Sequence, residues 1–354
     1  MVGWDAEQGI TLTLARGDTT LLIELEPLDP ARDCYARTAL FNVCVRRQFA
    51  AGHDLSELDH HAMDQLVRLV RDREADLPRF DRPTTNRRSL VREIEVDRVL
   101  VPEGAGHYYV DPYVGCMIGC EFCYVGPRAD LSRRLEGLPE LAWGRYVDVK
   151  INAAEVLRRE LPQHPPGVLR MSPLVTDPYQ PLESHYRITR QCLEAMVGTG
   201  YVPTILTRGA RVVDDLDLLT RFPRAAVGFS IPSDDDAMRV RFEPGGDPID
   251  ERLDALERCS RAGLATFAVI QPVLPMNVER LVDLVAPWAR AVRIDRMHDI
   301  PRVRHLYDAA GLGWAAEPAF FDQTIAELRE RFAARGVPYD ELDDMTSVLG
   351  LAPG

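Results

Sequence analysis

The sequence predicts an α/β protein built on a parallel sheet and preceded by a small β-rich module. Three observations favour this fold class. Beyond Arg92, short apolar runs alternate with amphipathic segments. Single helical patterns separate those runs, which implies right-handed crossovers between parallel strands. Before that point, residues 10–48 alternate apolar and polar types, as half-exposed strands do.

The N-terminal part is expected to form a β-plus-helix module over residues 1–85. Its strand patterns are ITLTLA, TTLLIELE and ALFNVCVRR, separated by RGD and EPLDPARD. The following segment opens with Asp54 or Ser56 as a helix cap and keeps apolar residues at helical spacing to about Leu77.

Six strands are predicted in a second region, over residues 86–316. They are GHYYVDPYVG, GVLRMS, VPTILTR, AAVGFSI, LATFAVIQP and AVRID. The helical patterns include ITRQCLEAMVGTG, VVDDLDLLTRF, DERLDALERCSRAG and NVERLVDLVAPWARA. Such a sheet stays open or curls into a barrel, and its functional side chains gather at the carboxyl ends of the strands. A last amphipathic helix is expected at the start of residues 317–354.

Composition and charge narrow the possible partners. Of 354 residues, 46% are apolar and 27% charged, as in ordinary globular proteins. The formal net charge of -13 opposes unassisted binding to nucleic acid, which depends on Lys and Arg neutralising phosphates. No apolar segment reaches the roughly 20 residues of a membrane span, and the start lacks a signal-peptide pattern. We therefore expect a cytoplasmic protein without a nucleic acid or membrane partner.

Three of the seven cysteines stand together in YVGCMIGCEFCYVG, as Cys116, Cys120 and Cys123. They follow the first strand of the second region, at its carboxyl end. The other four are scattered among apolar neighbours, as buried small hydrophobes are. A long chain with this distribution does not resemble a disulfide framework.

Three clustered thiols are compatible with more than one metal group. Structural zinc takes four ligands, and His107, the nearest additional one, lies in the preceding strand pattern. A cluster of four irons and four sulfurs takes one protein ligand per iron, so three thiolates leave one iron open. Gly115 and Gly119 would let the backbone wrap around a bulky cluster, and Phe122 and Tyr124 could shield it from water.

The spacing Cys116-x3-Cys120-x2-Cys123 resembles the cluster loop of the radical S-adenosylmethionine (SAM) superfamily. Other segments resemble its spore photoproduct lyase-like branch over about residues 107–295, including VDVKINAAEVLRREL, SPLVTDPYQPLESHYRITRQCLE, TILTR, GFSI and RFEPGGDPIDERLDALERCSRAGLATFAVIQPVLP. The resemblance implies a partial (β/α)6 TIM-like barrel, a [4Fe–4S] cluster, SAM and a reducing partner such as flavodoxin or ferredoxin. In this superfamily one electron cleaves SAM at the open iron to a 5'-deoxyadenosyl radical, which abstracts hydrogen from a substrate.

The resemblance also implies roles for individual residues. The three cysteines would be the cluster thiolates, and Phe122 resembles the residue that packs near the adenine. Arg208 ends the third strand, where the family often has a Lys that meets the SAM carboxylate. A guanidinium could make that contact bidentately. Ser230 in GFSI matches a serine that contacts SAM, and Thr176 and Asp177 resemble the SAM-facing loop.

Each of these residues also has a simpler interpretation. Arg208 could be a surface charge, Ser230 a helix cap and Asp177 the former of an Asp-Pro turn. Tyr124 aligns with a tyrosine near the hydrogen-return path of the lesion-repair members, and it could equally pack as a lid on the cluster. Glu243 in RFEP matches a family motif, and an ion pair with Arg239 or Arg241 would explain it equally well.

One departure from the family bears on the substrate. The lesion-repair enzymes carry a hydrogen-donating cysteine ahead of the Thr-Asp stretch, where this sequence has Ser172, Pro173, Leu174 and Val175. The sequence therefore favours a radical SAM enzyme acting on a small-molecule, nucleotide-like or natural-product substrate. A nucleic-acid lesion lyase is the first alternative, and a non-catalytic zinc or iron-sulfur scaffold is the second.

Overall fold

The computed structural model describes residues 90–340 except for positions 105, 137, 139–140 and 173–174. It also describes Val67, Arg68, Gly350 and five N-terminal strands. The chain divides into two compact units, residues 1–89 with 127–142 and residues 90–126 with 143–354. The domain boundaries expected at 85/86 and 316/317 stay predictions.

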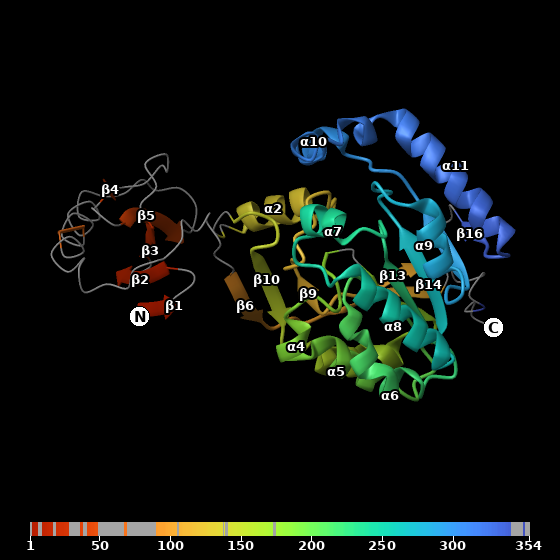
Figure 1. The fold of residues 1–354 in the computed structure, drawn as a ribbon. Coiled ribbons are helices and arrows are strands. Elements are labelled where there is room, and N and C mark those ends of the chain that lie inside the picture. Colours follow the sequence, from red (N-terminus) through yellow and green to blue (C-terminus); the bar gives the residue numbers. More distant parts are fainter. Residues whose placement is uncertain are drawn as a thin grey trace. The chain divides into compact units, whose positions relative to one another are not determined.

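The first unit contains an antiparallel sheet with the strand order β1-β2-β3-β5-β4 (Figure 1). The strands are β1 (Val2–Asp5), β2 (Gly9–Arg16), β3 (Thr19–Pro27), β4 (Ala36–Arg37) and β5 (Phe41–Gln48). This confirms the strand pattern of residues 10–48. The helix expected from Asp54 or Ser56 to Leu77 lies outside the described residues, apart from Val67 and Arg68, which are helical.

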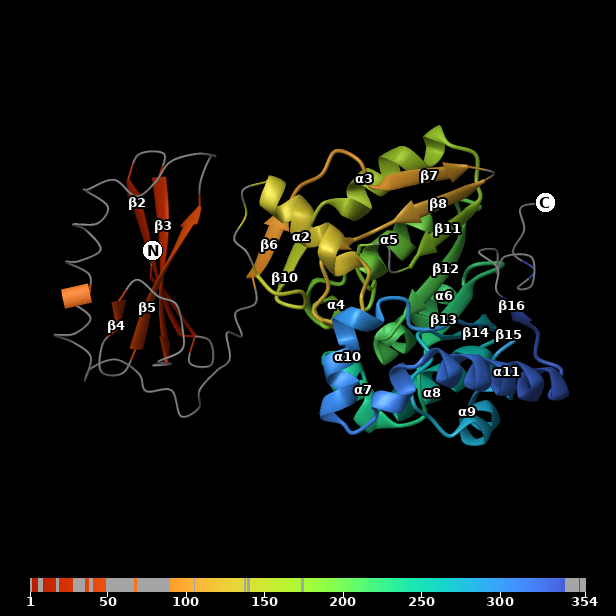
Figure 2. The same ribbon diagram turned by 90° about the horizontal axis from the view of Figure 1, so that it is seen from above.

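The second unit is built on an eight-stranded sheet with the order β16-β15-β14-β13-β12-β11-β8-β7 (Figure 2). Its six central strands are parallel neighbours and correspond to the six predicted strands. They are β8 (His107–Val110), β11 (Val168–Met171), β12 (Val202–Thr207), β13 (Ala226–Ser230), β14 (Ala265–Ile270) and β15 (Ala291–Ile294). Two edge strands were not predicted, the antiparallel β7 (Leu100–Gly104) and the short parallel β16 (Tyr339–Asp340). The described sheet keeps two edges, so the barrel is partial, as expected.

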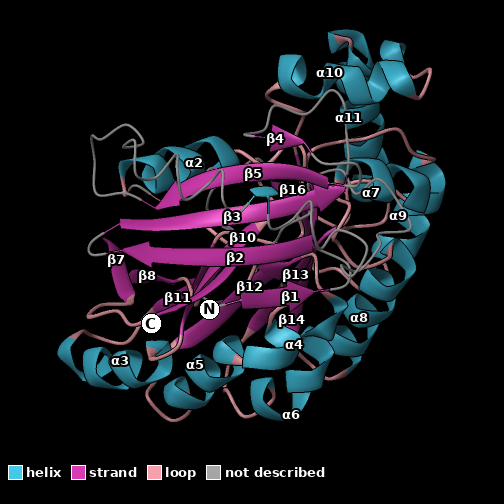
Figure 3. Ribbon diagram, turned by 90° about the vertical axis from the view of Figure 1, so that its left-hand side faces the viewer, coloured by secondary structure: helices cyan, strands magenta, loops and turns pink. Residues whose placement is uncertain are grey.

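Helices α5, α6, α8 and α9 lie in an arc along the outside of this sheet (Figure 3). The crossover elements are α5 (Ile188–Met196), η3 (Ala210–Asp215), α6 (Leu216–Leu219), α7 (Asp236–Phe242), α8 (Ile249–Arg261) and α9 (Val278–Val285). Beyond β15 follow α10 (Ile300–Ala309), η4 (Gly313–Ala316) and α11 (Pro318–Ala334), which confirms the predicted last helix. Among the described residues no helix has the length and apolar character needed to cross a membrane.

The central strands are buried because helices cover them. Every residue of β13 and β14 is buried. Gly228 in β13 leaves room for a neighbouring ring, since an added Cβ would lie 2.1 Å from Phe267. Burying one large apolar side chain contributes about 1.5–3 kcal/mol, so these strands form a rigid frame for the loops at their carboxyl ends.

A second, three-stranded sheet positions the cysteines. Its order is β6-β10-β9, with β6 (Leu90–Ile94), β10 (Tyr146–Lys150) and β9 (Tyr113–Val114). Arg92 donates two hydrogen bonds to Asp148, at 2.9 and 2.7 Å, and so links β6 to β10. The helices α3 (Ala153–Glu160) and α4 (Glu183–Tyr186) belong to the same unit. This sheet, which the sequence did not predict, fixes the chain directly before the first thiol.

Candidate active site

The cysteine loop, residues 115–124, folds tightly after β9. Gly115 and Gly119 have φ values of +90° and +62°, a region that side chains with a Cβ rarely adopt. A Cβ on Gly115 would also lie 2.4 Å from the carbonyl oxygen of Tyr146. The turns bring Cys116 and Cys120 into one buried cluster with Ile118, against which Cys123, Phe122 and Trp143 pack.

Burial controls the protonation of these thiols. It raises the pKa of Cys116 to about 12 and that of Cys120 well above its ordinary value. Burial also raises the pKa of Cys123, although backbone hydrogen bonds and Arg208 oppose the shift. A bound metal replaces the proton of a ligating thiol, so these three groups are suited to ligation once a metal is present.

The number of thiols on the cysteine loop matches what a four-iron cluster with one open iron requires. Among the described residues, no group of three or more His, Cys, Asp or Glu side chains converges as a single metal ion requires. A four-iron cluster takes one protein ligand per iron, so three thiolates leave one iron open. The loop supplies that number, with Cys116 and Cys120 buried and Cys123 partly buried.

Neutral hydrogen bonds attach the cysteine loop to the segment after β11. Thr176 Oγ1 donates to the carbonyl of Gly115 at 2.7 Å, and the Gln180 side-chain amide donates to Thr176 Oγ1 at 2.8 Å. Gln180 Oε1 accepts from the backbone N–H of Met117 at 3.0 Å. Thr176 therefore supports the loop backbone from its buried position.

Asp177 joins the same segment to the end of β12. Its carboxylate accepts from Thr207 Oγ1 at 2.5 Å, from the backbone N–H of Arg208 at 2.8 Å and from that of Tyr179 at 2.9 Å. The bond from Tyr179, two residues on, is the Asp turn that the simpler interpretation expected. The other two bonds fix the backbone from which the Arg208 side chain extends.

Arg208 is a largely buried cation beside the cysteine loop. Its side chain is only 11% exposed, so the surface-charge interpretation is wrong. Cζ lies 5.5 Å from the centroid of the Phe122 ring. Nε donates to Glu243 at 2.5 Å, and Nη2 makes a long contact of 3.4 Å with the carbonyl of Gln271.

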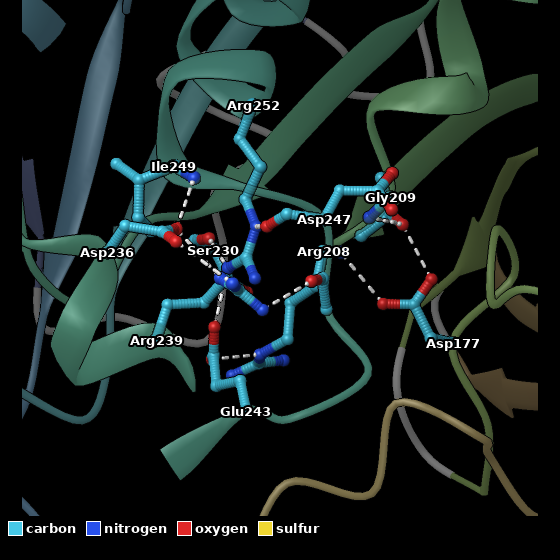
Figure 4. A network of polar contacts seen from close by, with 12 residues as sticks. Asp177, Arg208, Gly209, Ser230, Asp236, Arg239, Glu243, Asp247, Ile249 and Arg252 are labelled. Carbon is cyan, nitrogen blue, oxygen red and sulfur yellow. Dashed lines mark hydrogen bonds and ion pairs between the residues drawn. The ribbon is translucent and has the colours of Figure 1, made fainter. Parts of the chain in front are cut away.

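Glu243 is fully buried between two arginines (Figure 4). One carboxylate oxygen accepts from Arg208 and the other from Arg252 Nη1 at 2.6 Å. Burial opposes its ionisation, but Arg252 and Arg208 outweigh burial and hold the pKa of Glu243 below its ordinary value. The expected ion pair with Arg239 or Arg241 is wrong. Arg239 pairs instead with Asp236, at 2.7 Å.

Ser230 and Tyr124 differ in exposure. Ser230 ends β13, is 1% exposed, and its carbonyl accepts from Arg252 at 2.9 Å. The helix-cap interpretation is wrong for Ser230, because Asp235 caps the next helix, α7. Tyr124 directly follows the third thiol and is 54% exposed, so most of its ring is not packed as a lid.

The chain is similar in sequence to proteins of known and unknown activity. A radical SAM Nalpha-GlyT isomerase of Pseudomonas phage M6 is 27% identical over 223 residues, which cover 63% of this chain and 42% of the phage protein. An uncharacterised protein of Methanocaldococcus jannaschii is 28% identical over 183 residues, 51% of this chain and 66% of that protein. The matches thus span less than two thirds of either relative. No protein-family model matches the chain.

The fold has a clear counterpart among solved structures. A spore photoproduct lyase complexed with dinucleoside spore photoproduct matches with a TM-score of 0.51 at 13% identity, covering 81% of this chain and 94% of that one. The chain has the radical SAM fold. This confirms the resemblance inferred from the sequence, including the partial barrel of that superfamily.

Within this radical SAM fold, the structure brings together Cys116, Cys120, Cys123, Phe122 and Arg208. Three further residues near the site had not been singled out from the sequence. They are Gln180, Arg252 and Arg302 of α10, and Arg302 donates to the carbonyl of Cys123 at 2.7 Å, across 179 positions. Nothing in the local sequence around these three indicates such distant partners.

Proposed function

We propose that this protein is a radical SAM enzyme that acts on a small-molecule, nucleotide-like or natural-product substrate. The observation that supports this most strongly is the cysteine loop, whose three thiols are clustered at the carboxyl end of a parallel sheet beside a largely buried arginine, Arg208. The phage relative, itself named a radical SAM isomerase, supports the same activity. When bound, a [4Fe–4S] cluster and SAM would supply a 5'-deoxyadenosyl radical that abstracts hydrogen from the substrate.

The residues of this chain would bind, orient and shield these groups. In our proposal Cys116, Cys120 and Cys123 ligate the cluster. Arg208 meets the carboxylate of SAM, and Phe122 packs near its adenine. We further propose that Ser230 contacts SAM.

We assign the other candidate residues to support and hydrogen transfer. Thr176 and Asp177 border the SAM site and hold the cysteine loop and Arg208 in place, which agrees with their hydrogen bonds. We assign Tyr124 to the hydrogen-return path, because it follows the last thiol and is accessible.

The substrate and partners belong to the same proposal. A net charge of -13 and the lack of a thiol at positions 172–175 disfavour the nucleic-acid lesion lyase. A protein without a basic groove should show little affinity for DNA at moderate salt. Reduction would come from a flavodoxin- or ferredoxin-like donor in the cytoplasm.

Anaerobic reconstitution with iron and sulfide tests the function. We expect a brown protein that produces 5'-deoxyadenosine from SAM and dithionite, measured by liquid chromatography and mass spectrometry. Changing any one of the three loop cysteines to Ala should abolish the product, since each thiolate holds a separate iron. Cys259→Ala, which alters a buried cysteine on α8, should retain it.

Two results would contradict the proposal. One is retained SAM cleavage in two of the three loop variants. The other is stoichiometric zinc binding without any 5'-deoxyadenosine after thorough reconstitution, which would favour the non-catalytic scaffold.

A further inference from the structure

Residues 242–247, which run from the last residue of α7 towards α8, connect directly to the cysteine loop. The backbone N–H of Glu121 donates to the carbonyl of Phe242, and that of Gly245 donates to the carbonyl of Ile118, both at 2.9 Å. A Cβ on Gly245 would lie 2.4 Å from the carbonyl oxygen of Met117, so this close approach requires glycine.

The same segment reaches the ends of two neighbouring strands (Figure 4). Glu243 binds Arg208 after β12, and through Arg252 it is linked to the carbonyl of Ser230 at the end of β13. Asp247 accepts from the backbone N–H of Ala210 at 2.6 Å. One short segment is therefore attached to the cysteine loop and to both strand ends that carry proposed SAM contacts.

The contact with Glu243 also orients the Arg208 guanidinium. A guanidinium is planar with donors in fixed directions, so a carboxylate on Nε determines where Nη1 and Nη2 point. Within the part of the chain that the structure describes, Nη1 has no hydrogen-bond partner, and Nη2 has only the long contact with Gln271. The edge opposite Glu243 is thus the one available to a ligand carboxylate.

Glu243 is itself held in place. Its second oxygen is bound by Arg252, which is fully buried and also donates to the carbonyl of Asp247 at 2.8 Å. Gly246 packs against the Arg252 guanidinium, where a Cβ would lie 2.3 Å from Nη2. A carboxylate fixed on both oxygens in a buried setting has little freedom to follow a moving arginine.

We propose that Glu243 is a positioning residue that holds Arg208 in the orientation needed to bind the carboxylate of SAM. This inference rests on the proposed function and deepens it. Glu243 acts through Arg208 and does not contact the ligand. Arg252 supports Glu243, and residues 242–247 keep Arg208 at a fixed position relative to the cysteine loop.

A double-mutant cycle tests this role. The wild type, Glu243→Gln, Arg208→Ala and the double variant are reconstituted, and the Kd of SAM is measured by calorimetry on the oxidised cluster. We expect Glu243→Gln to weaken SAM binding by about tenfold with unchanged iron content, the lower end for a hydrogen bond to a charged group. In the Arg208→Ala background the same change should have no further effect. Asp214→Asn, which alters an exposed acid paired with Arg211, is the matched control and should leave the Kd unchanged.

Two results would overturn the role of Glu243: wild-type affinity in Glu243→Gln, or additive effects of the two substitutions. If Glu243→Gln retains no iron, Glu243→Asp replaces it in the cycle. Aspartate keeps the charge, but its shorter side chain places the carboxylate further from Arg208. A wild-type Kd in that variant would therefore also contradict the proposal. A wild-type protein that takes up no cluster or binds no SAM contradicts the proposed function instead, which separates the two failures.

Discussion

Glu183 and Glu243 are both buried beside elements that hold the cysteine loop, but their surroundings differ. Glu243 lies between Arg208 and Arg252, and its pKa is lowered. Glu183, the first residue of α4, accepts from the hydroxyl of Tyr113 and from the backbone N–H groups of Thr189 and Arg190. Burial raises its pKa to about 7, against the opposing effect of these hydrogen bonds.

The difference shows that burial alone does not set the charge of a carboxyl group. Two cations keep Glu243 ionised over the ordinary pH range. Among the described residues, Glu183 has only neutral hydrogen-bond donors to oppose the effect of burial, so its pKa stays at about 7. Ion pairs therefore hold the segment around Glu243. The region around Glu183 is held by hydrogen bonds whose strength depends on pH.

The largest expected effect on stability comes from removing one of the two arginines that pair with Glu243. Arg252→Met leaves Glu243 with one partner and the carbonyl of Ser230 without its donor. Breaking a buried ion pair in this way costs about 3–5 kcal/mol, measured as the free energy of unfolding in urea. Arg258→Met, on the exposed side of the same helix, should cost less than about 1 kcal/mol. Equal losses in the free energy of unfolding of the two variants would contradict the stabilising role of the buried ion pair.

The second prediction concerns pH and Glu183. Its folded pKa of about 7 exceeds the ordinary 4.5, so the folded protein retains a proton that the unfolded chain releases between these values. The stability contributed by this group is complete below pH 4.5 and is lost as pH rises to about 7. From pH 5 to 7.5, the free energy of unfolding of the wild type should fall by about 2 kcal/mol more than that of Glu183→Gln. Parallel pH profiles of the two proteins would contradict the raised pKa.

Features set by local sequence could be predicted, whereas contacts that depend on tertiary folding could not. The six central strands are visible because they are continuous apolar runs, and the thiols because their spacing is local. The three-stranded sheet was missed, since β9 has only two residues and pairs across the cysteine loop with β10. Glu243 was matched to the nearby Arg239 or Arg241, but its true partners lie 35 and 9 positions away. Ion pairs that form only through tertiary folding produce no periodic pattern in the sequence.

The smallest predicted effect tests the neutral attachment of the cysteine loop. Thr176→Val keeps the shape of the side chain but removes the donor to Gly115 and the acceptor for Gln180. The Gly115 carbonyl would keep only the contact from Gln180, at 3.2 Å. We expect a loss of about 1–2 kcal/mol in the free energy of unfolding, the range for unpaired buried polar groups.

Thr176→Ser, which retains the hydroxyl, should recover most of this loss and serves as the control. Because these bonds are neutral, the difference between Val and Ser should be the same at pH 5 and pH 7.5, unlike that between the wild type and Glu183→Gln. A difference that changes with pH would mean that Thr176 is coupled to a titrating group, and the distinction between the two attachments of the loop would no longer hold.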